Sequence, residues 1–262
     1  MKTKLSGLLA LAALPIAALA QFADTFTTLD PAWIPNRYDP AGFESVVFDG
    51  DNRLRLTIDE ADSAANRPAL FSNAFYDIQG RQHPGGVTGR WSISAEVYVA
   101  SAVNTATGQI VGAELWGHSG PTPTGGDYLT LGFTNASPTD AYDINAADRT
   151  FRFQAYDATL GNWVDLGVPG GFLFDTWHTL SGVSTGATFA YYIDGNLVYT
   201  KATAAGDDLE SVIVQGANYG ATGSYAVYWD NVTASAIPEP AAVALLAAVA
   251  ALGLVIWHRR QG

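Results

Sequence analysis

Two glutamates stand at matching positions in neighbouring segments of the chain and could form a catalytic pair. Segment 89–100 alternates apolar and polar residues, and Glu96 falls on its polar side. Segment 108–118 alternates in the same way and places Glu114 on its polar side. Two carboxyl groups about 5–9.5 Å apart can cleave a glycosidic bond, one as an acid and the other as a nucleophile or base. If the two segments pair as strands, Glu96 and Glu114 meet across the sheet.

Aromatic and planar polar side chains share this polar phase in the same and later segments. Aromatic rings can stack on the apolar face of a sugar, and planar polar groups can bond to its edge. Trp116 and Tyr128 flank one loop and are the strongest candidates for contacts with a ligand. The competing interpretation is that this face packs against a loop or a second sheet, with Trp116 in the core. The candidate ligand-binding residues are Glu96, Tyr98, Glu114, Trp116, His118, Tyr128, Arg152, Gln154 and Tyr156.

Other chemistries find little support in the sequence. The chain has no cysteine, which excludes disulfides and thiolate metal sites. Its four histidines lack metal-ligand spacing, and no phosphate-binding glycine loop precedes a helix. The net charge is −12, and four of the 13 basic residues lie at the two ends, so the middle of the chain is more acidic still. Such a charge repels nucleic acid, which we do not expect as a partner.

Between the two ends of the chain, the alternation of apolar and polar residues predicts strands rather than helices. Glycine, proline and aspartate gather at 83–86, 118–127 and 135–148, which predicts loops there, and Asp194-Gly195 predicts a two-residue hairpin turn. No repeat or internal linker occurs, so residues 21–235 should form one β-sandwich. The predicted strands are 53–59, 89–100, 108–118, 127–135, 149–157, 161–166, 177–183, 187–193, 196–201, 209–215 and 224–234.

The segment "DTWHTLSGVSTGATFAYYIDGNLVYT" (175–200) resembles a strand pair of concanavalin A-like lectin/glucanase jelly rolls, including laminin-G-like modules. The resemblance implies an all-β, two-sheet antiparallel jelly-roll sandwich, with Trp177 in the core and a structural His178. The closing "YAVYWDNVTAS" (225–235) resembles the last strand of these domains, which pairs with an N-terminal strand such as "FADTF" (22–26).

The same resemblance implies what a site could contain. Laminarinase-like jelly rolls carry their carboxylates on one strand as E-x-D-x-x-E, and no such string occurs here. We therefore expect no catalytic residues. Related sandwiches often bind a structural Ca²⁺ between the first and last strands, where Asp24 and Asp230 stand. The alternative for these two residues is an ordinary exposed or capping aspartate.

The N-terminus predicts a secretory signal peptide at 1–20. Lys2 and Lys4 precede an apolar stretch, and Ala18-Leu19-Ala20 is an A-x-A-like cleavage site. Signal peptidase should therefore cut before Gln21. An uncleaved N-terminal anchor is the alternative, but the apolar stretch is short for a membrane span.

The C-terminal segment 236–262 combines three features in a fixed order. Pro238-Glu239-Pro240 comes first, the uncharged run 241–257 follows, and Arg259-Arg260 closes the chain. The run is just long enough to span a membrane, with the arginines on the cytoplasmic side. The segment resembles the PEP-CTERM sorting signal of Gram-negative bacteria, which implies an exosortase as processing partner and a role in exopolysaccharide and biofilm.

These features predict an exported protein that is anchored transiently in the inner membrane and then reaches the cell surface or extracellular matrix. We expect it to be noncatalytic and to bind or associate with exopolysaccharide. The alternative is a laminarinase-like glycoside hydrolase or lyase that uses Glu96 and Glu114.

Overall fold

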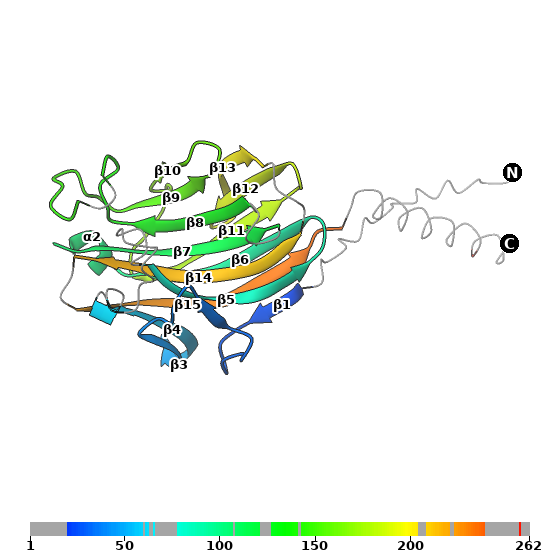
Figure 1. Cartoon of the computed structure of the whole chain (residues 1–262), viewed down its shortest axis with the longest axis horizontal. Coiled ribbons are helices and arrows are strands. Elements are labelled where there is room, and N and C mark those ends of the chain that lie inside the picture. The colour runs from blue at the N-terminus through cyan, green and yellow to red at the C-terminus, as the bar shows by residue number, and fades with distance from the viewer. Residues whose placement is uncertain are drawn as a thin grey trace, which may run out of the picture. The chain divides into compact units, whose positions relative to one another are not determined.

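The structure is a computed structural model in which residues 20–237 form one β-sandwich of two antiparallel sheets (Figure 1). No described helix is long and apolar enough to cross a membrane. The structure describes residues 20–59, 61–62, 65, 78–106, 108–120, 127–140, 143–203, 208–220, 223–238 and 257.

Sheet A and sheet B have the following strand orders. Sheet A runs β13 (Asn196–Ala202), β12 (Thr188–Ile193), β11 (Thr176–Ser184), β6 (Trp91–Val99), β15 (Ser224–Ala236), β4 (Asp51–Asp59) and β3 (Gly42–Phe48), with β1 (Ala20–Asp24) also paired to β15. Sheet B runs β10 (Asn162–Gly167), β9 (Arg152–Asp157), β8 (Asp127–Thr134), β7 (Ile110–Ser119), β14 (Leu209–Tyr219), β5 (Ile78–Val87) and β2 (Ile34–Asn36). The short helix α2 (Ala102–Thr105) lies between β6 and β7 in the chain.

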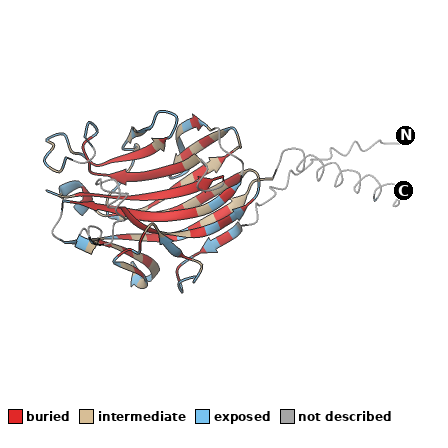
Figure 2. Cartoon of the chain, in the orientation of Figure 1, coloured by how far each residue is buried: buried red, intermediate tan, exposed pale blue. Residues whose placement is uncertain are grey.

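The core fills the space between the sheets because the strands alternate as the sequence predicts. Every second residue of β6, from Trp91 to Val99, is fully or almost fully buried. Trp91 and Trp229 are the largest side chains with no exposed surface. Figure 2 shows this burial along the strands of both sheets. At Gly182 of sheet A the core leaves no room for a side chain, because a Cβ there would overlap Leu129 of sheet B.

The structure confirms the predicted two-sheet jelly roll and several of its local features. Strand β1 pairs with the closing strand β15, as the resemblance implied. Asp194 and Gly195 form the turn between β12 and β13 with φ of 50° and 75°, the positive values that a two-residue hairpin requires. All eleven predicted strands are present.

Three strands were missed, and one predicted loop is wrong. Strands β2, β3 and β5 were not predicted, and residues 83–86, predicted as a loop, lie within β5. Pro84 lies opposite Ser211 of β14, just beyond Gln82, where the pairing of β5 with β2 ends.

Trp177 is not in the core, which corrects the role implied by the resemblance. His178 and Leu180 face inward on β11, so Trp177 falls on the outer face of sheet A. There its Nε1 donates to Asp49 at 3.1 Å. His178 is structural as expected, because its ring nitrogens contact Asp194 and the carbonyl of Leu173.

The predictions for the two ends fall almost entirely outside the described residues. This holds for residues 1–19 of the signal peptide, for Glu239 and Pro240, and for Arg259 and Arg260. Of the predicted cleavage and sorting residues, Ala20 begins β1 and Pro238 follows the last strand.

The close approach at Gly182 gives a test of the sheet packing. We expect Gly182→Ala to lower the free energy of unfolding by about 1–3 kcal/mol, because the added methyl group overlaps Leu129 in a filled core. Gly170→Ala is the control, since a Cβ there meets no atom within 4 Å. Urea unfolding of both variants measures the difference, and equal stability of the two would contradict the packing described.

Candidate functional site

A row of side chains crosses the outer face of sheet B and includes Glu114. Strand pairing sets Glu114 of β7 directly opposite Gln215 of β14 on one side and Gly132 of β8 on the other. The row continues to Gln154 of β9 and Asp165 of β10. Residues that are paired across neighbouring strands stand on the same face of a sheet, so these side chains line one path.

Glu114 is a buried carboxyl group held by two donors. Its side chain is only 5% exposed. Gln215 Nε2 donates to Glu114 Oε2 at 2.7 Å, and Trp116 Nε1 donates to the same oxygen at 2.8 Å. Burial raises the pKa of Glu114, while the two hydrogen bonds and the charge of Arg37 lower it in part. Because both donors use Oε2, the other oxygen is the natural place for a proton.

Glycine beside Glu114 makes this arrangement possible. A Cβ on Gly132 would overlap the backbone oxygen of Ala113 and lie 2.7 Å from Glu114 Cγ. A Cβ on Gly80 of β5 would likewise lie 2.5 Å from Gln215 Cβ. Larger residues at these two positions would displace the carboxyl group or its donor.

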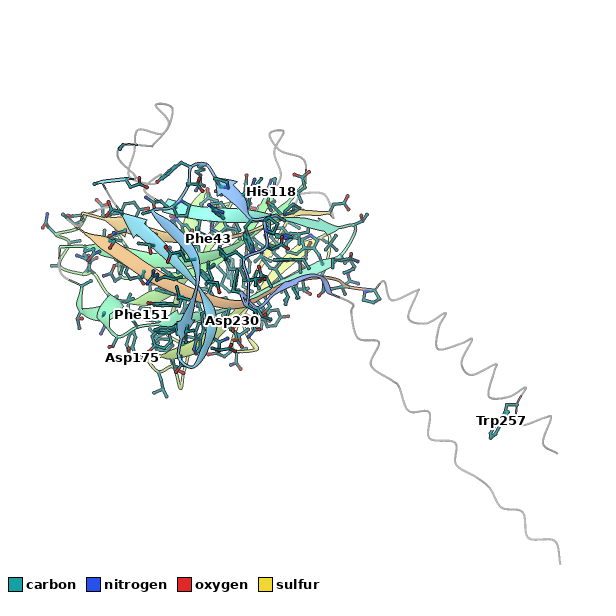
Figure 3. The ribbon with its side chains drawn as sticks, turned by 90° about the horizontal axis from the view of Figure 1, so that it is seen from below. Phe43, His118, Phe151, Asp175, Asp230 and Trp257 are labelled. Atoms are coloured by element: carbon teal, nitrogen blue, oxygen red, sulfur yellow. The ribbon has the colours of Figure 1, made fainter. Side chains whose placement is uncertain are left out.

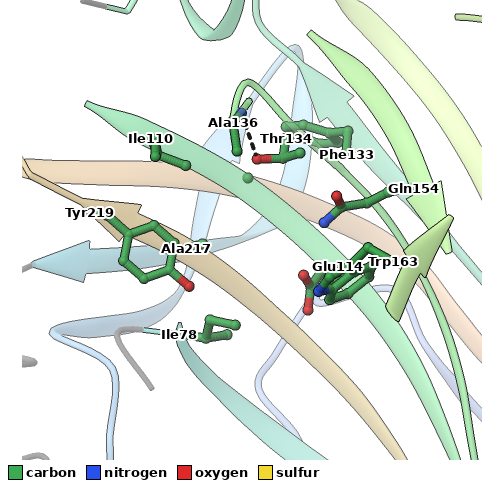
Figure 4. Close-up of a pocket in the computed structure, with 11 residues that line it drawn as sticks. Ile78, Ile110, Glu114, Phe133, Thr134, Ala136, Gln154, Trp163, Ala217 and Tyr219 are labelled. Atoms are coloured by element: carbon green, nitrogen blue, oxygen red, sulfur yellow. Dashed lines mark hydrogen bonds between the residues drawn. The ribbon is translucent and has the colours of Figure 1, made fainter. Parts of the chain in front are cut away.

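A pocket of about 30 Å³ lies beside Glu114 (Figure 4), with room for one or two water molecules. Gln154 and Trp163 line it on the side of β9 and β10, and Tyr219 lines it from β14. Trp163 is partly exposed and packs edge-on against Tyr156 with ring centroids 5.4 Å apart. Among the described residues, these two rings are the accessible aromatic surface next to Glu114.

Trp116 is a support for Glu114 rather than an exposed platform. It is 7% exposed, and the Arg37 guanidinium lies 5.4 Å from its ring centroid. Tyr128 packs against the edge of Trp116 at 5.3 Å and stacks on His118 at 4.6 Å. Three of the predicted ligand residues therefore form one packed aromatic group.

Arg152 also lies on this face but acts within the protein. It is 5% exposed and donates to the backbone oxygens of Ala136 and Ser137. Asp165 lies 4.0 Å from its Nε. Arg152 therefore ties strand β9 to the chain that follows β8.

The predicted pairing of Glu96 with Glu114 is wrong. Strand β6, which carries Glu96, pairs with β11 and β15 in sheet A, whereas β7 belongs to sheet B. Glu96 and Tyr98 therefore lie on the outer face of the opposite sheet, where Glu96 accepts a hydrogen bond from Asn231. Figure 3 shows the separation, since His118 and Asp230, the register partner of Glu96, lie in different layers. The other seven predicted ligand residues share the outer face of sheet B.

Asp24 and Asp230 do not form the expected calcium site. Asp24 turns inward with Phe22, and its two oxygens accept hydrogen bonds from Phe26 N and Trp33 Nε1. Asp230 follows the inward Trp229, so it faces outward, where it pairs with Arg53. No group of three metal-binding side chains occurs among the described residues. The two residues do not fit a shared Ca²⁺ ion, because Asp24 faces inward with both oxygens hydrogen-bonded while Asp230 faces outward and pairs with Arg53 through Oδ2.

No protein-family model and no curated protein sequence matches the chain. Solved structures do match its fold. A Bacteroides ovatus family 16 glycoside hydrolase from a mixed-linkage glucan locus, in complex with a tetrasaccharide product, aligns over 81% of this chain and 99% of its own, with a TM-score of 0.56 and 14% identity. A structure titled for endo-acting O-glycanases of the human gut microbiota has a TM-score of 0.52, 14% identity and coverage of 84% and 100%. A second B. ovatus family 16 enzyme, an endo-glucanase, has a TM-score of 0.50, 13% identity and coverage of 81% and 99%.

These neighbours define the class of the fold as the concanavalin A-like jelly roll found in glycoside hydrolase family 16. They also overturn the prediction that the domain is noncatalytic. These three structures are titled as family 16 glycoside hydrolases or as O-glycanases, which agrees with the alternative of a glycoside hydrolase and not with the prediction of a noncatalytic protein. The prediction depended on the missing E-x-D-x-x-E string, a pattern along one strand, whereas the groups around Glu114 come from several strands.

Sequence reasoning missed four residues of this site: Gln215, Gly132, Trp163 and Glu210, whose carboxylate lies 3.6 Å from His118 Nδ1. Gln215 and Glu210 lie about a hundred positions after Glu114, and only strand pairing brings them beside β7. Trp163 was placed in a predicted strand without a role. Trp163 alternates in phase with Asp165, on the polar side of its strand, and it pairs with Tyr156 of β9. An aromatic residue on the polar side of a strand was the signal that could have identified it.

The raised pKa of Glu114 predicts how stability depends on pH. The folded pKa lies above the ordinary value of 4.5, so ionising Glu114 costs more in the folded state than in the unfolded state. Its contribution to stability is present below the ordinary pKa and is lost as the pH rises through the folded pKa. We expect Glu114→Gln to gain stability relative to the wild type over that range, by about 1.4 kcal/mol for each tenfold difference in proton affinity.

Urea unfolding at a series of pH values measures this effect. Glu44→Gln is the control, because it also removes a carboxylate but from a side chain that is 53% exposed. This variant should not show the gain in stability with rising pH that is expected for Glu114→Gln. A constant difference between wild type and Glu114→Gln at all pH values would show that the burial of Glu114 does not perturb its titration.

Proposed function

We propose that the chain is a glycoside hydrolase that works on the outer face of sheet B, with Glu114 as the acid that protonates the leaving oxygen. The observation that carries the proposal is the buried Glu114 carboxyl beside a pocket, with a raised pKa and two fixed donors. A catalytic acid must hold its proton near the working pH, and burial is the usual means of achieving this for a glutamate.

The donors of Glu114 suit this role in two ways. Gln215 Nε2 and Trp116 Nε1 hold Oε2 in place, which leaves the opposite oxygen to carry the proton toward a substrate. They also stabilise the carboxylate that forms when the proton leaves, because hydrogen bonds to the charged form favour it. Burial and the two donors therefore act at successive stages of one proton transfer.

The surroundings favour a neutral glycan as the substrate. Trp163 and Tyr156 offer aromatic surface for stacking on a sugar, and Gln154 adds an amide that can bond to hydroxyl groups. The net charge of −12 disfavours polyanionic glycans. Two of the similar structures are named for glucan or glucanase chemistry, which supports a β-glucan as the first substrate to test.

Glu114→Gln tests the catalytic role. We expect release of reducing ends from mixed-linkage β-glucan or mucin O-glycans to fall by about 10²–10⁴-fold, because the amide cannot donate the proton. The isosteric change should leave the fold intact. Asp165→Asn is the matched control, since Asp165 lies in the same row but its side chain is 51% exposed.

Two results would contradict the proposal. One is wild-type protein that releases no reducing ends from any glycan of a broad panel. The other is a Glu114→Gln variant that retains full activity while Asp165→Asn does not.

We further propose that the domain is exported from a Gram-negative cell and sorted to its surface or matrix. The support is the sequence alone: the signal-peptide pattern at 1–20 and the PEP-CTERM-like segment at 236–262, with its Pro-Glu-Pro, apolar run and paired arginines. A signal peptidase and an exosortase are the partners that would process the two ends. An exported hydrolase with this tail would act on glycans of the cell envelope or biofilm.

Mass spectrometry of the mature protein tests this processing. We expect the N-terminus to be Gln21 and the C-terminus to lie near Pro238, with the protein in the surface or matrix fraction. Changing Arg259 and Arg260 to alanine should keep the tail attached, because the basic end of the signal is lost. Recovery of the intact 262-residue chain from the cytoplasm would contradict export.

A further inference from the structure

The pocket beside Glu114 forms where small residues meet on three neighbouring strands. Gly112 of β7 lies opposite Ala217 of β14 on one side and Thr134 of β8 on the other. All three stand on the same face as Glu114, which follows Gly112 by two positions along β7. Gly112 has no side chain and Ala217 adds a single methyl group, so the sheet leaves a pocket of about 30 Å³ at this point.

One side of the pocket is apolar. Five of the lining residues form a hydrophobic cluster that is separate from the core between the sheets, and none of them is more than 8% exposed: Ile78, Ile110, Ala136, Ala217 and Tyr219. Figure 4 shows Ile78, Ile110 and Tyr219 across the pocket from Gln154. A methyl group of a ligand would be removed from water on this side, which favours its binding there.

The other side of the pocket carries an amide that has no partner in the part of the chain that the structure describes. Gln154 of β9 is 7% exposed, and its side chain makes no hydrogen bond to any described residue. Figure 4 shows its amide end directed into the pocket. A primary amide offers donors and an acceptor in one plane. Because a buried amide without partners is costly, a group of the ligand is expected to bond to it.

Thr134 adds a hydroxyl donor next to this amide. Its Oγ1 accepts a hydrogen bond from the backbone nitrogen of Ala136 at 3.1 Å (Figure 4). A hydroxyl group can donate one hydrogen bond while it accepts another, and no described residue accepts the proton of Thr134. Gln154 and Thr134 together can therefore bond to both the C=O and the N–H of a second amide.

We propose that this pocket binds the acetamido group of an N-acetylated sugar, so that the substrate is a neutral glycan that contains N-acetylhexosamine. This inference rests on the proposed glycosidase function and names its substrate class. The methyl group of the acetamido group lies against the apolar side of the pocket. Its C=O accepts from the Thr134 hydroxyl or the Gln154 amide, and its N–H donates to the Gln154 oxygen.

The size and polarity of the pocket favour this group over others that sugars carry. A methyl group and a carbonyl oxygen each take about the room of one water molecule, and the pocket holds one or two. A hydroxyl group would leave the apolar side without contact. A carboxylate or sulfate would meet no cation among the described lining residues, and it would lie beside Glu114. The ring of the same sugar stays outside, where the partly exposed Trp163 can stack on it.

Chitotetraose and cellotetraose test the inference, because they share one β-1,4-linked chain and differ only at C2, which carries acetamido in the first and hydroxyl in the second. We expect chitotetraose to bind about 10–100-fold more tightly, since it gains hydrogen bonds and buries a methyl group. Calorimetric titration measures both affinities, with Glu114→Gln as the background in which the ligand is not turned over.

Two further substitutions in this background test the two sides of the pocket separately. Gln154→Met removes the amide but keeps an unbranched side chain of similar length, and Ala217→Val fills the apolar side. Each should bring the affinity for chitotetraose down to about that for cellotetraose, whereas a purely structural role would weaken both ligands alike. Asp165→Asn is the control, because Asp165 pairs with Gln154 in register but does not line the pocket, so the selectivity should remain.

The outcomes separate this inference from the proposed function. Equal affinity for the two tetrasaccharides, or no binding of chitotetraose, would overturn the acetamido site, while hydrolysis of β-glucan by the wild type would still support Glu114 as the acid. Selective binding of chitotetraose without hydrolysis of any glycan would overturn the glycosidase, and the pocket would then bind this sugar but not as a substrate. Selectivity that survives both Gln154→Met and Ala217→Val, in variants shown to be folded by circular dichroism, would exclude this pocket.

Discussion

The site depends on the burial of strand β7 on both of its faces. All ten residues of this strand are buried, so its inner side chains join the core while its outer ones, including Glu114, leave water as well. A carboxyl group in such a place is costly unless donors meet it. Gln215 and Trp116 supply them, and glycines on the flanking strands leave the space they need. The position of one glutamate thus constrains residues on four strands of sheet B.

Sequence alternation predicted which side of each strand a residue occupies, but not which sheet the strand joins. Strands β7, β8 and β9 follow one another in the chain and pair as neighbours, so their outward residues were grouped correctly. Strand β6 precedes β7 with the same phase, yet the chain crosses through α2 to the other sheet between them. Glu96 and Glu114 therefore have equivalent local patterns and opposite positions. Strand order depends on contacts distant in sequence, and periodicity carries no information about those contacts.

The same limit explains the partners that were missed. Gln215 and Glu210 come from β14, which inserts between β7 and β5 although it lies near the end of the domain. A search along one strand for a run of carboxylates cannot find groups that arrive from a neighbouring strand. At 13–14% identity to the similar hydrolases, the chain keeps their fold while its central strand offers a carboxyl, an indole and an imidazole in turn.

Burial of this face shifts the pKa values of Glu114 and His118 in opposite directions. In water a glutamate with a pKa of 4.5 gives up its proton before a histidine with a pKa of 6.5 does, so between these values both groups are charged. Burial penalises both charges, which raises the pKa of Glu114 and lowers that of His118. Both shifts favour the uncharged form, so the outer face of β7 tends to carry less charge than its residue types would carry in water.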